Sequence, residues 1–139
     1  MTEYIYVDII LRLFVHVDAE ADLEKLWVDA PEAAARISVL LEKLEGNQDL
    51  LDRLTQHDFG NYRSADFHVS KWLNQWNKGR DLWRLKVWNL EDKGLKYRVV
   101  YAYLPGKSQY HVLGIVSREF DYDPRHEISR RIIAAYENL

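Results

Sequence analysis

The sequence predicts an α+β fold: an antiparallel sheet of about four strands with N-terminal helices packed on one face, a concave basic surface on the other, and a C-terminal helix. Two kinds of pattern support this fold class. Residues 82–88, 97–103 and 111–118 form three consecutive apolar runs that are typical of strands. Apolar residues recur at helical spacing within residues 18–54, and residues 123–139 have the features of a terminal helix.

A single domain is expected over residues 1–139, with a helical insert or extension within about residues 29–79. The 47% share of hydrophobic residues suffices for one core. The absence of cysteine excludes disulfides, a thiolate nucleophile and cysteine-ligated metals. Because Asp8 and Arg12 interrupt the apolar N-terminal stretch, we expect neither a signal peptide nor a membrane span, and a cytoplasmic location.

The first elements are predicted from alternation and capping residues. Residues 4–17 are rich in Ile, Val and Tyr and predict an opening strand. Its core face would carry Ile5, Val7, Ile9, Leu11 and Leu13. Asp18 is predicted to cap a helix that runs through Trp27, with Leu23 and Leu26 on the same stripe.

A second helix is predicted to begin after Asp29, because this capping residue precedes an early proline, Pro31, and a glutamate three positions after the cap. Its apolar positions recur as far as Gly46, a typical C-terminal stop. They are Ile37, Leu40, Leu41 and Leu44. A shorter helix is predicted over residues 47–54, followed by a turn at residues 59–61.

Two tryptophans, Trp72 and Trp76, lie one helical turn apart in a helix predicted over residues 70–76. We expect them to pack in the core or to contact a protein partner, and base stacking is the alternative. The apolar region from Trp72 to Trp88 is therefore a candidate docking surface.

The C-terminal helix is predicted from Asp123 and Pro124, a capping residue followed by a proline that suits a first helical turn. Its apolar side chains form one stripe, which would face the core. The stripe consists of Ile128, Ile132, Ala135 and Leu139.

Each of the three strand-like runs in the C-terminal part is associated with basic residues. Because successive side chains of a strand alternate between its faces, Arg84 and Lys86 share one face of the first run. Lys96 and Arg98 share one face of the second run, and Arg118 ends the third. We therefore expect the sheet to collect positive charges on one surface.

The net charge of −3 conceals an asymmetry between the two parts of the chain. Residues 1–59 hold 5 basic and 13 acidic residues, a balance of −8, whereas residues 60–139 hold 14 and 9, a balance of +5. A basic half suits an anionic partner such as RNA, since phosphate contacts dominate nucleic-acid affinity. Helices with a solvated face explain the acidic half equally well.

The order of these elements resembles the RelE/ParE superfamily of toxins from type II toxin–antitoxin systems. The resemblance covers roughly residues 80–139 and rests mainly on two motifs, Tyr97-Arg98-Val99-Val100-Tyr101 and the apolar strand 113–120 that contains Arg118. The resemblance to RelE-like mRNA interferases implies an endoribonuclease that cleaves mRNA, acts on the ribosome, and needs no metal or other cofactor. It also implies a cognate antitoxin that neutralises the toxin within a hetero-oligomer. The acidic total of this chain departs from the basic composition of many such toxins.

The resemblance implies roles for individual residues. Cleavage of RNA without a metal requires positioned cations and a group that transfers protons. Arg98 and Arg118 match the strand arginines that bind the scissile phosphate, and Tyr122 lies near the tyrosine that assists proton transfer. The residues expected to bind RNA are Arg84, Lys86, Lys96 and His126.

Structural roles are the alternatives for these residues. Arg98 or Arg118 would serve as an ion-pair partner of Glu119 or Asp121. The alternatives to Tyr122 are Tyr101, Tyr103 and Tyr110, and His111 and His126 are surface histidines if they take no part in proton transfer. A zinc site at His57 and His68 is not expected, because no carboxylate lies at metal-ligand spacing.

Two other functions remain open. A protein similar to ParE would inhibit DNA gyrase through protein contacts and would need no catalytic residues. A non-catalytic binding or regulatory domain would keep the fold without the chemistry, since a fold does not determine a function.

Overall fold

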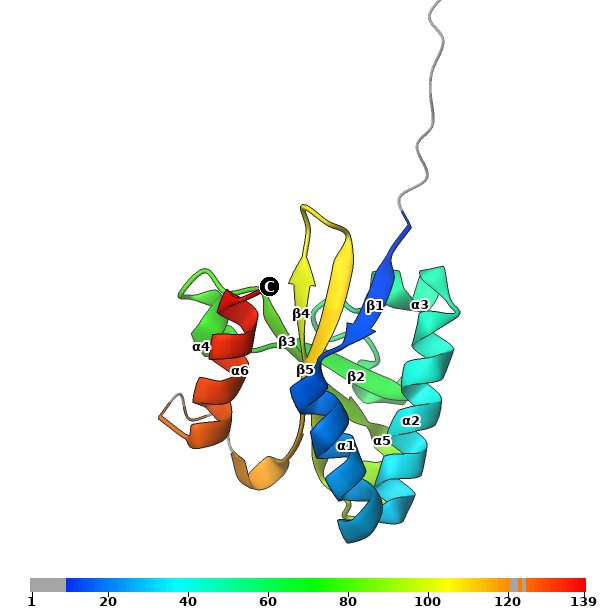
Figure 1. Ribbon diagram of the computed structural model, residues 1–139. Helices are drawn as coiled ribbons and strands as arrows, with labels where there is room; N and C mark the ends of the chain where they lie inside the picture. The colour runs from blue at the N-terminus through cyan, green and yellow to red at the C-terminus, as the bar shows by residue number, and fades with distance from the viewer. Residues whose placement is uncertain (1–9, 121–122, 124) are drawn as a thin grey trace, which may run out of the picture.

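The computed structural model describes residues 10–120, 123 and 125–139 (Figure 1). In this part of the chain the elements follow one another as β1 (Arg12–Val15), α1 (Val17–Asp29), α2 (Pro31–Glu45), α3 (Gln48–Arg53), a 3-10 turn (Asn61–Arg63), β2 (Phe67–Lys71), α4 (Leu73–Trp76), β3 (Leu82–Val87), α5 (Trp88–Asp92), β4 (Tyr97–Leu104), β5 (Gln109–Ser117), a second 3-10 turn (Arg118–Phe120) and α6 (Glu127–Glu137). The α+β class predicted from the sequence is confirmed.

The sheet has five strands in the order β1-β5-β4-β3-β2. Strands β2 to β5 pair in antiparallel fashion, whereas β1 pairs with β5 in parallel. The prediction of about four antiparallel strands is therefore wrong in two respects. β2 overlaps the start of a helix predicted from the sequence, and it adds a fifth strand to the sheet. β1, which three helices separate from β2 along the chain, pairs with the last strand and runs parallel to it.

The two faces of the sheet carry different helices. One face packs against α1, α2 and α3, and its core includes Ile37, Leu41, Leu85 and Tyr101. The opposite face packs against α6, where Val100 and Ile132 are fully buried. α6 therefore lies across the sheet from α2 (Figure 1).

α6 leaves part of its face of the sheet uncovered. Its Arg131 guanidinium forms two hydrogen bonds to the Asp22 carboxylate of α1, at 2.9 and 2.6 Å. The backbone N–H of Ile115 in β5 donates to the same carboxylate at 3.0 Å. The C-terminal helix is thus fixed beside β5, and the far ends of β2, β3 and β4 remain accessible for a site.

The predicted helices are observed, with corrections at their N-termini. His16 caps α1 in place of Asp18, because its Nδ1 accepts a hydrogen bond from the Asp18 N–H at 3.1 Å. Ala30 occupies the N-cap of α2 in place of Asp29, and Pro31 takes the first helical turn as predicted. Trp27 is 47% exposed and does not join the core stripe.

The other sequence predictions for these helices are confirmed, except for the N-cap of α6. The four apolar positions predicted for α2 are buried, and Gly46 follows the end of the helix. α3 begins after Asn47, whose side-chain Oδ1 accepts a hydrogen bond from the Leu50 N–H. In α6, Ile132 and Ala135 are buried, but the N-cap is His126 and not Asp123; Pro124 lies outside the described residues.

The opening strand is shorter in the described part than predicted. Leu13 of β1 is buried and Leu11 is partly buried. The predicted core positions Ile5, Val7 and Ile9 lie outside the described residues. None of the helices among residues 10–120 and 125–139 is long and apolar enough to span a membrane.

The two tryptophans of the predicted helix pack on opposite sides of the sheet. Trp72 is 2% exposed and meets Phe120 edge-on, with ring centroids 5.8 Å apart, in the core beneath α6. Trp76 meets Trp83 edge-on at 5.4 Å on the other side. Their packing role is observed, and the docking surface proposed for this region is wrong for Trp72 and Trp83 because both side chains are buried.

Candidate active site

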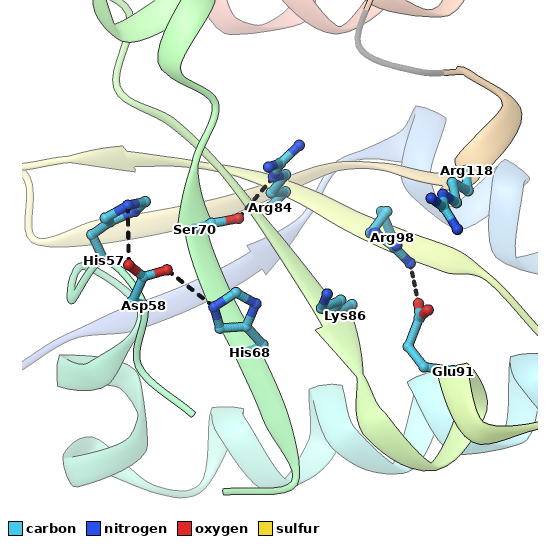
Figure 2. A pocket seen from close by; sticks show the side chains of 9 residues that line it. All are labelled: His57, Asp58, His68, Ser70, Arg84, Lys86, Glu91, Arg98 and Arg118. Carbon is cyan, nitrogen blue, oxygen red and sulfur yellow. Dashed lines mark hydrogen bonds and ion pairs between the residues drawn. The ribbon is translucent and has the colours of Figure 1, made fainter. Parts of the chain in front are cut away.

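A cavity of about 420 Å³ opens on the α6 face of the sheet, beyond the part that α6 covers (Figure 2). Its walls come from β2, β3, β4, α5, the loop before β2 and the residue after β5. The lining residues are His57, Asp58, His68, Ser70, Arg84, Lys86, Glu91, Arg98 and Arg118. Four positively charged side chains and two histidines thus surround one space.

Strand alternation places the central residues of this cavity. β2 and β3 are paired so that His68 lies opposite Lys86 and Ser70 lies opposite Arg84. The Arg84 Nε donates a hydrogen bond to the Ser70 Oγ at 2.7 Å. In Figure 2 Arg84 and Lys86 lie between the histidines at one end and Arg98 at the other.

The structure brings together four of the seven residues predicted for the site, namely Arg84, Lys86, Arg98 and Arg118. Lys96 is exposed and does not line the cavity; its carbonyl accepts a hydrogen bond from the Arg118 N–H at 2.8 Å. His126 caps α6 and meets Phe120 edge-on, away from the cavity lining. Tyr122 lies outside the described residues.

Arg98 has an ion-pair partner, Glu91, that was not predicted from the sequence. Its guanidinium donates to the Glu91 carboxylate of α5 and to the Tyr97 carbonyl, the latter at 3.0 Å. The side chains of Arg98 and Glu91 are 11% and 14% exposed, so that the pair is nearly buried. Of the partners predicted for Arg98, Asp121 lies outside the described residues. The Glu91 carboxylate holds the Arg98 guanidinium at the cavity wall.

The tyrosines considered as alternatives to Tyr122 face the other side of the sheet. Tyr101, Tyr103 and Tyr110 pack in the core beneath α1, α2 and α3. The Tyr101 hydroxyl donates to the Leu54 carbonyl at 2.7 Å, and burial raises the pKa of Tyr101 well above its ordinary value. Burial likewise raises the pKa of Tyr110 to about 12. These hydroxyl groups are therefore remote from the cavity.

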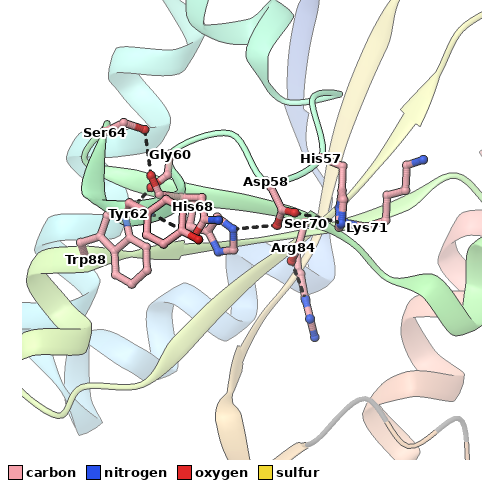
Figure 3. A network of polar contacts seen from close by, with 11 residues as sticks. His57, Asp58, Gly60, Tyr62, Ser64, His68, Ser70, Lys71, Arg84 and Trp88 are labelled. Carbon is pink, nitrogen blue, oxygen red and sulfur yellow. Dashed lines mark hydrogen bonds and ion pairs between the residues drawn. The ribbon is translucent and has the colours of Figure 1, made fainter.

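Asp58 connects two histidines at one end of the cavity (Figure 3). Its carboxylate lies 3.2 Å from the His68 Nε2 and 3.5 Å from the His57 Nε2. Because the His57 Nδ1 accepts a hydrogen bond from the Lys71 N–H at 3.1 Å, a neutral His57 carries its proton on Nε2, toward Asp58. The three residues form a polar network next to the basic cluster.

The loop that carries Asp58 has an unusual backbone. Four of its residues have a positive φ, namely Asp58 (66°), Gly60 (80°), Tyr62 (56°) and Arg63 (64°). The loop is held to the edge of the sheet by hydrogen bonds at 2.9 Å from the Asp58 N–H to the Val69 carbonyl and from the Val69 N–H to the Phe59 carbonyl. The Trp88 indole N–H donates to the Gly60 carbonyl at the same distance. These contacts determine where Asp58 meets His68.

Five lining residues were not predicted from the sequence to be functional: His57, Asp58, His68, Ser70 and Glu91. A signal for two of them was present in residues 67–71, where apolar and polar residues alternate. Phe67 and Val69 are buried, while His68 and Ser70 face the cavity. Asp58 also provides the carboxylate contact for His57 and His68 that the spacing did not suggest. In the described part of the chain, no three histidine or carboxylate side chains are arranged to hold a metal ion.

The charge of the cavity affects the titration of Lys86. Burial lowers the pKa of Lys86 below its ordinary value, and the positive charge of Arg98 is the next largest cause. Glu91 opposes this shift in part, whereas Arg84 and Arg118 add to it. The cavity therefore has a positive potential that would favour an anionic ligand.

Replacing Lys86 by Met is expected to raise the free energy of unfolding at pH 7. Because the pKa of Lys86 is lower in the folded protein than in the unfolded chain, the folded wild type recovers stability as the pH rises toward about 10.5. The advantage of Lys86→Met should shrink over that range. Urea unfolding at pH 7 and pH 10 checks this, with Lys78→Met as an exposed control. A wild type that is as stable as Lys86→Met at pH 7 would contradict the prediction.

Comparisons with protein-family models, with curated proteins and with solved structures found no match to this chain. The residues of the cavity and their chemistry are therefore the basis for a functional assignment.

Proposed function

We propose that the protein is the RelE-like toxin component of a type II toxin–antitoxin system, an endoribonuclease that cleaves mRNA on the ribosome. A cognate antitoxin would neutralise it in a hetero-oligomer. The observation that supports this most strongly is the juxtaposition, in one cavity, of four positively charged side chains with the Asp58–His68 pair. This combination offers both charge stabilisation and proton transfer.

In the proposed reaction the ribose 2′-oxygen attacks the adjacent phosphorus. The bond from phosphorus to the 5′-oxygen breaks, which leaves a 2′,3′-cyclic phosphate and a new 5′-hydroxyl group. The 2′-hydroxyl loses its proton, and the departing 5′-oxygen gains one. Negative charge develops on the phosphoryl oxygens, and Arg84, Lys86, Arg98 and Arg118 surround the space where they would lie.

His68 is our candidate for the proton-transfer group among the described residues. Its side chain lines the cavity opposite Lys86, and the Asp58 carboxylate 3.2 Å from its Nε2 orients the ring. Histidine is the usual side chain for proton transfer in ribonucleases, and a carboxylate partner fixes the orientation and tautomer of its ring. Tyr122 remains a candidate for the same step on the family resemblance.

The nearly buried pair of Arg98 with Glu91 favours a second candidate function. If this pair is structural, the cations need no catalytic role. The protein would then act through protein contacts, either as a DNA gyrase inhibitor similar to ParE or as a non-catalytic binding domain.

Expression without a partner gene tests these alternatives. We expect the wild type to arrest growth and to create new mRNA 5′ ends, and an Arg98→Ala/Arg118→Ala double variant to do neither. Circular dichroism of the purified double variant checks that it folds, and Arg12→Ala/Arg130→Ala removes the same charge at exposed positions outside the cavity. Growth arrest with intact mRNA would point to gyrase or another target. Unimpaired growth with the wild type would favour the non-catalytic domain.

A further inference from the structure

We propose that Tyr62 forms a subsite that stacks a base of single-stranded RNA next to the cleavage cavity. This inference rests on the proposed function and deepens it, because it assigns substrate recognition to a residue outside the reacting centre. Three observations support it: the exposure of Tyr62, its backbone conformation, and the contacts that connect its loop to His68.

Tyr62 is 93% exposed, the highest value among the large exposed hydrophobic residues of the described chain. Other aromatic residues near the cavity are not free in this way. Trp72 and Trp83 are buried, and Trp88 is partly buried, with its ring in contact with Arg63, Lys86 and His68. The Tyr62 ring is thus the aromatic surface of this region that can receive a base.

The backbone of Tyr62 is held in an unfavourable conformation. Its φ of 56° and ψ of 25° lie in the left-handed region, which bulky residues rarely adopt. The Asn61 Oδ1 accepts a hydrogen bond from the Tyr62 N–H at 3.0 Å, and the Ser64 hydroxyl donates to the Asn61 carbonyl at 3.0 Å. Glycine would fit this position without strain, and strained residues concentrate at functional sites. A strained tyrosine with an exposed ring is therefore explained best by a ligand.

A chain of contacts connects the Tyr62 loop to the cavity (Figure 3). The Arg63 guanidinium lies 4.8 Å from the centre of the Trp88 ring, and the Lys86 ammonium lies 4.7 Å from it. Trp88 in turn stacks on His68, with ring centroids 5.7 Å apart and an interplanar angle of 19°. The loop that carries Tyr62 is thus connected through Trp88 to His68 in the cavity wall.

These surroundings favour RNA over a protein partner. A polyanionic strand whose phosphate lies in the cavity would continue past Lys86 and Arg63 toward Tyr62. Stacking on an aromatic ring requires a base that is free of its own neighbours, so that the ligand is single-stranded. The Arg63 guanidinium also forms two hydrogen bonds to the Asp92 carboxylate, at 2.7 and 2.5 Å, which hold the loop in place before the ligand arrives.

The test measures binding of a short 2′-O-methyl RNA, which lacks the nucleophilic hydroxyl and is not cleaved. We expect Tyr62→Ala to weaken binding by about 10-fold and Tyr62→Phe to leave it unchanged, since stacking needs the ring and not the hydroxyl. Trp27→Ala, an exposed aromatic on α1, is the matched control and should bind as the wild type does. With an abasic residue scanned along the RNA, one position should remove the difference between the wild type and Tyr62→Ala.

A second variant separates recognition from structure. Because glycine relieves the left-handed backbone, Tyr62→Gly is expected to raise the thermal unfolding midpoint by about 2–4 °C while it weakens RNA binding as Tyr62→Ala does. If the wild type binds the RNA and both variants bind it equally well, the subsite is wrong and the proposed function stands; Tyr62 would then serve a protein contact. If the wild type binds the RNA neither free nor on the ribosome, both the subsite and the proposed function are wrong.

Discussion

Replacement of Gly60 by Ala is expected to destabilise the protein by about 3 kcal/mol or more. A Cβ atom at this position would lie 1.7 Å from the Phe67 carbonyl oxygen and 2.9 Å from its carbon, and both are backbone atoms that no side-chain rotation can move away. The φ of 80° adds a cost of its own. The loop would have to lift from β2, which would separate Asp58 from His68 and the Gly60 carbonyl from Trp88.

A matched control separates the two causes of this effect. Gly79 has the same φ of 80°, but a Cβ there would meet no atom within 4 Å. Gly79→Ala is therefore expected to cost only the conformational part, about 1–2 kcal/mol. Denaturant unfolding of both variants measures the difference. If the two variants lose the same stability, the close approach of Gly60 to Phe67 has no energetic importance.

Replacement of His68 by Gln is expected to reduce the rate of RNA cleavage by about 10²–10⁴-fold. Glutamine keeps a polar group next to Asp58 but cannot transfer a proton near neutral pH. Because the four cations remain, the affinity for an uncleavable RNA should change little. The loss would thus fall on kcat and not on KM, a division that a merely structural role of His68 would not produce.

Three further variants test whether the loss of cleavage rate is specific to His68. His111→Gln changes a partly buried histidine that stacks on Phe14 and does not line the cavity, and its rate should equal that of the wild type. Asp58→Asn should reduce the rate as well, since the carboxylate orients the His68 ring. Tyr122→Phe tests the residue that the family resemblance implies. A full loss with Tyr122→Phe and none with His68→Gln would transfer the proton-transfer role to the tyrosine.

Sequence reasoning predicted the parts of the fold that depend on local periodicity. The apolar positions of α2 and the stripe of α6 follow from a spacing of 3.6 residues, and the ends of α2 follow from Pro31 and Gly46. The caps were less predictable, because several polar residues near a helix start compete for the N-terminal N–H groups. His16 precedes the first residue of α1, and its ring nitrogen accepts a hydrogen bond from the Asp18 N–H. His16 is therefore the N-cap residue in place of Asp18.

β2 shows how a competing pattern concealed an element. The two tryptophans at Trp72 and Trp76 predict a helix through residues 70–76, but the alternation of residues 67–71 governs the first part of this segment. Pairing with β3 then determines the outcome, because it places His68 opposite Lys86 and lets Trp72 and Trp76 pack on opposite sides. α4 is reduced to the single turn Leu73–Trp76.

The α+β class and the grouping of cations on one side of the sheet follow from local patterns, since side chains two residues apart in a strand share a face wherever the strand lies. Arg84 and Lys86 therefore line the cavity as the alternation implies. No local pattern predicts that Asp58 contacts His68, that Glu91 pairs with Arg98, or that β1 lies parallel to β5. These contacts depend on a loop with positive φ angles, on the placement of a short helix and on strand order, and each of these is selected by packing between distant segments.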